Sequence, residues 1–276
     1  MSLCIFANYY FELDESIRKN SLVVKLIAWT LVFALVFGIP WLVYRLILKR
    51  NYTRRSRFLY LFLIAPLLFA IKISLDIHFQ FSGDDGWNNY WNNIVYWPLL
   101  MLITGCLLLI TWKLSGAERP FYGLTARGVI WKPYLLMLLI MLPLIALAST
   151  QKDFLAVYPK LQAIESIFTD ERITWWHKLL FELSYGSDFF TIELFFRGFL
   201  VLAFIKCAGK DAILPMACFY CSIHFGKPIA ECISSYFGGL ILGVIVYNTR
   251  SIYGGLLVHL GIAWIMELGG YFGNSV

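Results

Sequence analysis

The sequence has little charge for its length. Charged residues make up only 14% of the 276 residues, whereas 60% are apolar. A soluble domain carries charge on about a quarter of its residues, so this composition excludes an ordinary soluble enzyme. The net charge of +6 comes from basic residues at the ends of apolar stretches, which is typical of membrane topology signals. We therefore expect a polytopic membrane protein, with the lipid bilayer as a partner and no nucleic-acid partner.

Other common signals are also missing. The six cysteines lie mostly in apolar stretches and predict no disulfide framework. Cys218 and Cys221 form a C-x-x-C before His224, but no second pair accompanies them, so we expect a packing role. Residues 1–20 lack a basic start, a long apolar core and a small-residue cleavage site, so no cleavable signal peptide is expected. There is no internal repeat and no appended soluble domain.

Long apolar runs dominate what is present. A hydrocarbon core about 30 Å thick needs roughly 20 apolar residues per helix. This length predicts an all-α bundle of about eight spans, with one membrane domain over 1–276 and four spans within 1–150. The predicted spans are 23–47, 57–76, 94–114, 134–149, 176–203 (with a break near "SYGSD", 184–188), 211–225, 233–248 and 252–269. The mixed segment 149–176 is expected along the membrane interface.

The basic residues predict the orientation. The first connection, 49–57, is densely basic, and the second, 79–89, is acidic without Lys or Arg. Basic residues return in the third, fifth and seventh connections. Lys and Arg mark cytoplasmic loops, so odd-numbered connections should lie inside and both termini outside. We expect an integral protein of a bacterial cytoplasmic membrane.

Four ionisable residues interrupt the last apolar spans. Ionisable groups at membrane depth are costly unless paired or hydrated, so each is a candidate functional residue. Glu193 and Arg197 are four residues apart, which on an α-helix allows a structural ion pair. His224 ends the sixth span. His259 lies near mid-depth of the last, after a glycine pair that would let another helix approach.

Taken together, these residues predict a polar intramembrane cavity. A carboxylate beside two imidazoles can deprotonate a water molecule, while the imidazoles stabilise a developing oxyanion. The same residues, Glu193, His224 and His259, are alternatively a zinc ligand set with one open position. A proton relay in a transporter is a third interpretation, although no inverted repeat accompanies it.

Over residues 175–270 the sequence resembles the CPBP (CAAX prenyl endopeptidase, bacteriocin-processing or Abi) family of intramembrane proteases. "IELFFRG" at 192–198 resembles its E-E-x-x-x-R-G motif, "YCSIH" at 220–224 its F-x-x-x-H, and "HLGIA" at 259–263 its H-x-x-x-N. The resemblance implies a helical membrane fold with a conical cavity, in which glutamate activates water and two histidines hold water or stabilise the oxyanion. The resemblance implies chemistry that does not require a metal, and the zinc alternative stays open.

The resemblance assigns catalytic roles to Glu193, His224 and His259 and supporting roles to Arg197 and Tyr220. Three positions depart from the pattern. Ile192 stands where the family has its first glutamate, the assigned base, and Ala263 replaces the final Asn. Tyr220 for Phe is a mild change.

Two main hypotheses follow from these matches and departures. The favoured one is an intramembrane endopeptidase with Glu193 as base, whose cavity opens outward toward a membrane-associated or exported peptide or protein. The other is an inactive pseudoprotease with a binding or immunity-type role, in which Glu193 is locked to Arg197 and points away from both histidines.

Overall fold

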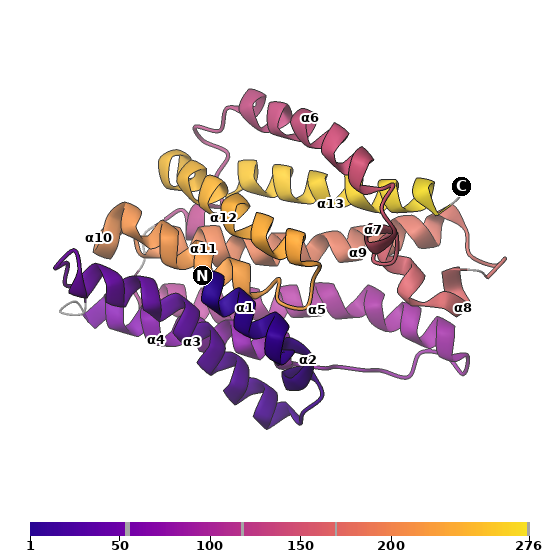
Figure 1. Cartoon of the computed structure of the whole chain (residues 1–276), viewed down its shortest axis with the longest axis horizontal. Coiled ribbons are helices and arrows are strands. Elements are labelled where there is room, and N and C mark those ends of the chain that lie inside the picture. The colour runs from indigo at the N-terminus through magenta and orange to yellow at the C-terminus, as the bar shows by residue number, and fades with distance from the viewer. Residues whose placement is uncertain (53–55, 117–118, 169, 275–276) are drawn as a thin grey trace. The chain divides into compact units, whose positions relative to one another are not determined.

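The chain is almost entirely helical. The computed structural model describes residues 1–52, 56–116, 119–168 and 170–274, and 79% of it is helix (Figure 1). No strand occurs among these residues. The predicted all-α class is thereby confirmed. Residues 53–55, which belong to the basic connection 49–57, lie outside the described residues.

The predicted spans all fall on helices. The longer elements are α3 (Leu22–Leu46), α4 (Ser56–Ser74), α5 (Asp85–Leu114), α6 (Trp131–Ala148), α9 (Trp175–Glu193), the π-helix η3 (Leu194–Ala203), α11 (Ile213–Ser222), α12 (Ile229–Thr249) and α13 (Tyr253–Gly273). The shorter ones are α1 (Ser2–Phe11), α2 (Leu13–Arg18), η1 (Phe121–Gly123), α7 (Lys152–Leu155), η2 (Lys160–Ala163), α8 (Glu165–Phe168), α10 (Ile205–Ala208) and η4 (Gly209–Ala212).

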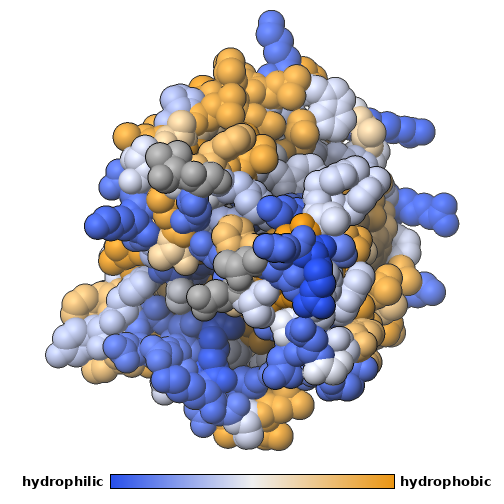
Figure 2. All heavy atoms as spheres, turned by 90° about the vertical axis from the view of Figure 1, so that its right-hand side faces the viewer, coloured by the Kyte–Doolittle hydropathy of each residue, from blue (hydrophilic) through white to orange (hydrophobic). Residues whose placement is uncertain are grey.

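Six helices of the described chain are long and apolar enough to cross a membrane: α3, α4, α5, α6, α12 and α13. The chain is therefore an integral membrane protein, while the count of about eight spans stays a prediction. Helix α11 has ten residues, about 15 Å at 1.5 Å per residue, roughly half of a hydrocarbon core. Large apolar side chains reach the surface, as Figure 2 shows on one face. Leu139 and Leu147 of α6, for example, are 61% and 67% exposed, as a lipid solvent allows.

The described chain forms two compact units whose sequences interleave. Unit 1 comprises Met1–Asp76, Thr104–Gly128 and Leu194–Ile252; unit 2 comprises Ile77–Ile103, Val129–Glu193 and Tyr253–Val276. The divisions predicted from hydropathy and motifs, a single domain with parts 1–150 and 175–270, stay predictions.

Aromatic side chains fill the core of unit 1. Helix α3 packs on α4 and α11, and α11 packs on α12. Phe33 and Phe37 of α3 both meet the ring of Phe219 on α11, with centroids 4.7 and 5.8 Å away. Gly243 lets α12 approach α11 closely, because a Cβ there would lie 2.6 Å from Met216. This packing fixes the end of α11, which carries His224.

Glycine also sets the helix packing of unit 2. Helix α13 contacts both α6 and α9 (Figure 1). Gly254 faces the ring of Tyr134 on α6, so closely that any side chain at 254 would overlap it. Gly186 of α9 faces Leu260 and Trp264 of α13, where a Cβ would be 3.2–3.3 Å from their atoms. The close approach predicted from the glycine pair before His259 is confirmed at Gly254.

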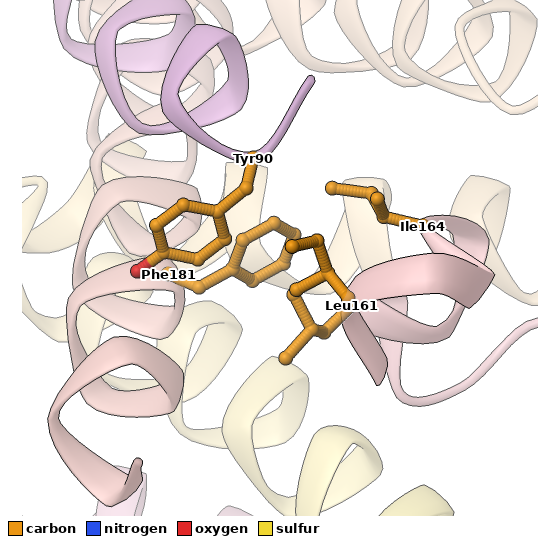
Figure 3. Packing of buried hydrophobic residues seen from close by; sticks show 5 residues of the cluster. Tyr90, Leu161, Ile164 and Phe181 are labelled. Carbon is orange, nitrogen blue, oxygen red and sulfur yellow. The ribbon is translucent and has the colours of Figure 1, made fainter. Parts of the chain in front are cut away.

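The segment between α6 and α9 docks within unit 2. Leu161, Ile164 and Ile167 pack against Tyr90 of α5 and Phe181 of α9 (Figure 3). The Lys160 amide also donates to Glu267 Oε2 of α13 at 2.7 Å. This anchoring explains how a segment of mixed polarity is ordered. Its position along the membrane interface stays a prediction.

The predicted break near 184–188 is wrong. Helix α9 runs without interruption from Trp175 to Glu193, and the irregularity begins one residue later, at Leu194, as the π-helix η3. Ser184 explains part of the difference, because its hydroxyl donates to the Ile94 carbonyl at 2.6 Å and needs no break in the helix. Within η3, Gly198 lies against the Tyr122 carbonyl, where a Cβ would be 2.7 Å from the oxygen.

Candidate functional site

A glutamate and a histidine meet in the core of unit 2. Glu193 is the last residue of α9, and His259 lies within the second turn of α13. His259 Nδ1 is 3.0 Å from Glu193 Oε1, and the Glu193 side chain is fully buried. These two residues, 66 apart in sequence, are thus brought together.

The contact fixes the state of the imidazole. An ionised carboxylate only accepts hydrogen bonds, so Nδ1 carries the hydrogen and donates it to Glu193. The other nitrogen, Nε2, is then the one that can take or give a proton. The ring of Phe189, one turn before Glu193, meets the His259 ring edge-on with centroids 4.8 Å apart and restricts its rotation. A carboxylate–imidazole pair held in this way suits proton transfer.

Arg197 has an aromatic partner in unit 1. Its guanidinium carbon lies 4.0 Å from the ring centre of Tyr220, and the side chain is fully buried. A desolvated cation–π contact is worth about 2 kcal/mol. Arg197 falls within the π-helix, where backbone bonds join residues five apart, so the four-residue spacing from Glu193 no longer indicates a shared face. The Tyr220 ring therefore covers the Arg197 guanidinium.

His224 follows α11 in a turn of unit 1. Its Nδ1 lies 3.0 Å from the Tyr220 carbonyl, and its ring meets the Tyr220 ring with centroids 4.8 Å apart. A carbonyl only accepts, so Nδ1 donates to the Tyr220 carbonyl. Tyr220 thus contacts both Arg197 and His224, and unit 1 brings these three predicted residues together.

The predicted site residues therefore form two groups, Glu193 with His259 and Arg197 with Tyr220 and His224. Convergence of both groups on one polar cavity stays a prediction. The departures from the family pattern occupy ordinary packing environments. Ile192 is half-buried beside Glu193, and Ala263, one turn after His259, is 6% exposed.

The donor set does not fit a zinc site. A catalytic zinc needs three protein ligands around one point. Across the part of the chain that the structure describes, no group of three or more His, Cys, Asp or Glu side chains is placed to hold a metal ion. Glu193 and His259 provide two such groups. We therefore derive no step through a metal.

The sequence interpretation missed a pair of neighbouring acids in unit 2. Glu182 of α9 and Glu267 of α13 lie close to each other and to Tyr271, and Glu267 is 2% exposed. Glu267 could have been found from the sequence, because it is an ionisable residue inside the predicted span 252–269. Lys72, 9% exposed on α4, was missed for the same reason.

Fold and buried ionisable residues together define a polytopic membrane protein with a buried glutamate–histidine pair. Residues 175–265 match the family model described as Type II CAAX prenyl endopeptidase Rce1-like. The resemblance to the CPBP family is thereby confirmed over the part of the chain that carries Glu193, His224 and His259. Comparison with curated proteins and with solved structures gave no significant match.

Proposed function

We propose that the protein is an intramembrane endopeptidase that hydrolyses a peptide bond in a membrane-associated or exported peptide or protein. The observation that carries the proposal is the 3.0 Å contact between buried Glu193 and His259. The match of this region to an Rce1-like endopeptidase family supports it. The contact also argues against the geometry of an inactive member in which Glu193 points away from both histidines.

The chemistry needs a base and an oxyanion donor. Glu193 takes a proton from water while the water oxygen attacks the substrate carbonyl carbon. His259, bound to Glu193 through Nδ1, offsets the carboxylate charge and holds the side chain in one orientation. A second imidazole, that of His224 in its doubly protonated form, donates from Nε2 to the oxyanion while Nδ1 still donates to the Tyr220 carbonyl. The proton on Glu193 then passes to the leaving amine as the carbon–nitrogen bond breaks.

Arg197 and Tyr220 act as positioning residues in this scheme. The Tyr220 carbonyl orients His224 through Nδ1, and the Tyr220 ring is held in turn by Arg197. Neither residue transfers a proton. Their loss is expected to lower turnover by misplacing His224.

A second candidate function is an inactive, binding member of the same family. Two observations favour it: apolar Ile192 has no group that takes a proton, and Ala263 lacks the amide that the family places after its last histidine. In this case the Glu193–His259 contact only stabilises the packing of α9 on α13.

Peptide hydrolysis by the purified full chain in lipid vesicles separates the two functions. The substrates are fluorogenic peptides of three kinds: farnesylated, with the same C-terminal sequence unprenylated, and with an apolar export-type segment. Glu193→Gln tests the base, and Glu15→Gln, at an exposed residue paired only with Lys19, is the matched control.

We expect wild type and Glu15→Gln to cleave at least one peptide, and Glu193→Gln to cleave it about 100-fold more slowly or worse. Full activity of Glu193→Gln would contradict the assignment of the base. Binding of a peptide without cleavage by any variant would favour the inactive member.

A further inference from the structure

Two cysteines of unit 1 meet next to the loop that carries His224. Cys221 lies near the end of α11 and Cys232 in the first turn of α12. Their sulfur atoms are 3.8 Å apart, and Cys221 Sγ is 3.2 Å from the Cys232 carbonyl oxygen. Both residues are fully buried, and both are free thiols in the structure. The partner of Cys221 is thus Cys232 and not Cys218 of the C-x-x-C.

We propose that Cys221 and Cys232 are a disulfide-forming pair that closes residues 221–232 into a covalent loop around His224. Opposed residues on neighbouring backbones suit a disulfide, which requires Cβ atoms about 4 Å apart. The sulfur atoms are already in contact, so bond formation needs only a small side-chain rotation. The predicted topology puts these helix ends outside the cytoplasm, where thiols meet oxidising partners.

The reaction requires a partner that contains a disulfide, such as a dithiol–disulfide oxidoreductase or oxidised glutathione. One cysteine thiolate attacks the partner disulfide and releases one partner thiol. The second cysteine sulfur then displaces the other partner thiol and forms the Cys221–Cys232 bond. The chain loses two electrons and two protons, and the partner disulfide is reduced to two thiols.

The N-terminal helix controls access to the pair. Met1, Cys4, Ile5 and Tyr9 pack against the cluster of Cys221, Phe225 and Cys232. The Tyr9 hydroxyl also donates to the Lys227 carbonyl of the same loop at 2.5 Å. A partner can therefore reach the sulfur atoms before α1 docks, or when α1 lifts away. The reduced form holds the loop by packing and hydrogen bonds, and the oxidised form adds a covalent bond.

The direct test is peptide mapping of the full chain taken from membranes with free thiols blocked at lysis. One portion is first treated with oxidised glutathione and another with dithiothreitol. We expect a peptide pair linked through Cys221 and Cys232, lighter by two hydrogens, in the oxidised portion. Cys218→Ser is the matched control, because Cys218 is buried one turn earlier on the same helix, and it should keep the link. Cys232→Ser should lose it.

Oxidation should also raise the melting temperature of the chain in micelles by on the order of 5 °C, because the loop is constrained in the unfolded state. Cys232→Ser should show no such shift, and Cys232→Ala serves if the serine variant folds poorly. The proposal would be overturned if Cys221 and Cys232 both carried the thiol-blocking group after glutathione treatment, which shows that no disulfide formed. A link from Cys221 to Cys218 would overturn it as well.

A consequence for activity rests on the proposed function. If His224 is catalytic, dithiothreitol should change the turnover of wild type at least twofold. The turnover of Cys232→Ser should be the same with and without dithiothreitol. A linked peptide pair in a chain without peptidase activity in either redox state would refute the proposed function and leave the disulfide pair standing. Turnover that dithiothreitol does not change in a linked, active chain would refute redox control of the loop.

Discussion

The imidazole of His259 donates to the carboxylate of Glu193 across 3.0 Å, and that carboxylate is fully buried. The bond joins the end of α9 to the second turn of α13. It is the one place where two of the predicted catalytic residues touch directly within the same unit. Its energetics and its chemistry can be tested separately.

Replacing His259 separates stability from activity. His259→Leu leaves the buried Glu193 charge without its donor and should destabilise the chain by about 3 kcal/mol. His259→Gln keeps an N–H donor, so it should retain much of the stability and still lose hydrolysis. Unfolding in mixed micelles and peptide cleavage measure the two effects. The control is Glu193→Leu with His259→Leu, which we expect to be more stable than His259→Leu alone, because the buried Glu193 carboxylate is removed as well. Equal stability of the two would disprove an energetic coupling.

Gly254 should tolerate no side chain. Any Cβ at this position overlaps the Tyr134 ring of α6, so Gly254→Ala should cost about 1–3 kcal/mol through overpacking. Gly238→Ala is the matched control, because nothing lies within 4 Å of its Cβ position. Adding Tyr134→Ala to Gly254→Ala should recover part of the loss. The unfolding midpoints of the four chains provide the measurement, and a Gly254→Ala midpoint no lower than that of Gly238→Ala would contradict the close approach.

The connection between α8 and α9, which carries Asp170 and Arg172, should weaken in acid. Hydrogen bonds from the Arg172 side chain and backbone lower the pKa of Asp170 to about 2. A depressed pKa in the folded state means that this stabilisation is present above the ordinary aspartate value near 4 and is lost as the pH falls toward 2. The melting temperature of wild type should therefore approach that of Asp170→Asn over this window. Arg172→Gln should behave like Asp170→Asn, and a constant difference from pH 5 to pH 2 would exclude the effect.

Both chain ends are expected on the outer side of the membrane. An even number of crossings, whether six or eight, puts them on one side, and the basic first connection assigns that side as the outside. Tags fused at either end should be removed by protease added to intact cells. A tag inserted beside Arg127, in the third connection, is the control and should survive, because this connection is inside for either count. Protection of both end tags would invert the topology, and with it the outward cavity.

Hydropathy predicted the helices well because a bilayer imposes both their length and their composition. It could not find the π-helix, since Leu194–Ala203 is as apolar as an α-helical span and differs only in backbone bonding. The rule that buried charge is rare at membrane depth found Glu193 and His259. The same rule applies to Glu267, but Glu267 matches no position of the family motifs and was not predicted. Arg197 was expected beside a carboxylate, and the structure places its guanidinium over the Tyr220 ring. Residue spacing along one helix cannot predict this partner, because Tyr220 lies on another helix, α11.

The π-helix has a consequence for depth. Ten α-helical residues advance about 15 Å, whereas a helix with wider turns advances less per residue. The π-helix Leu194–Ala203 is therefore shorter in space than its residue count suggests. Under the predicted topology, we expect Arg197, counted from the cytoplasmic end of this stretch, nearer to that surface than a uniform α-helix would place it. Measurements of solvent accessibility at successive residues should show a smaller change in depth per residue after Glu193 than before it.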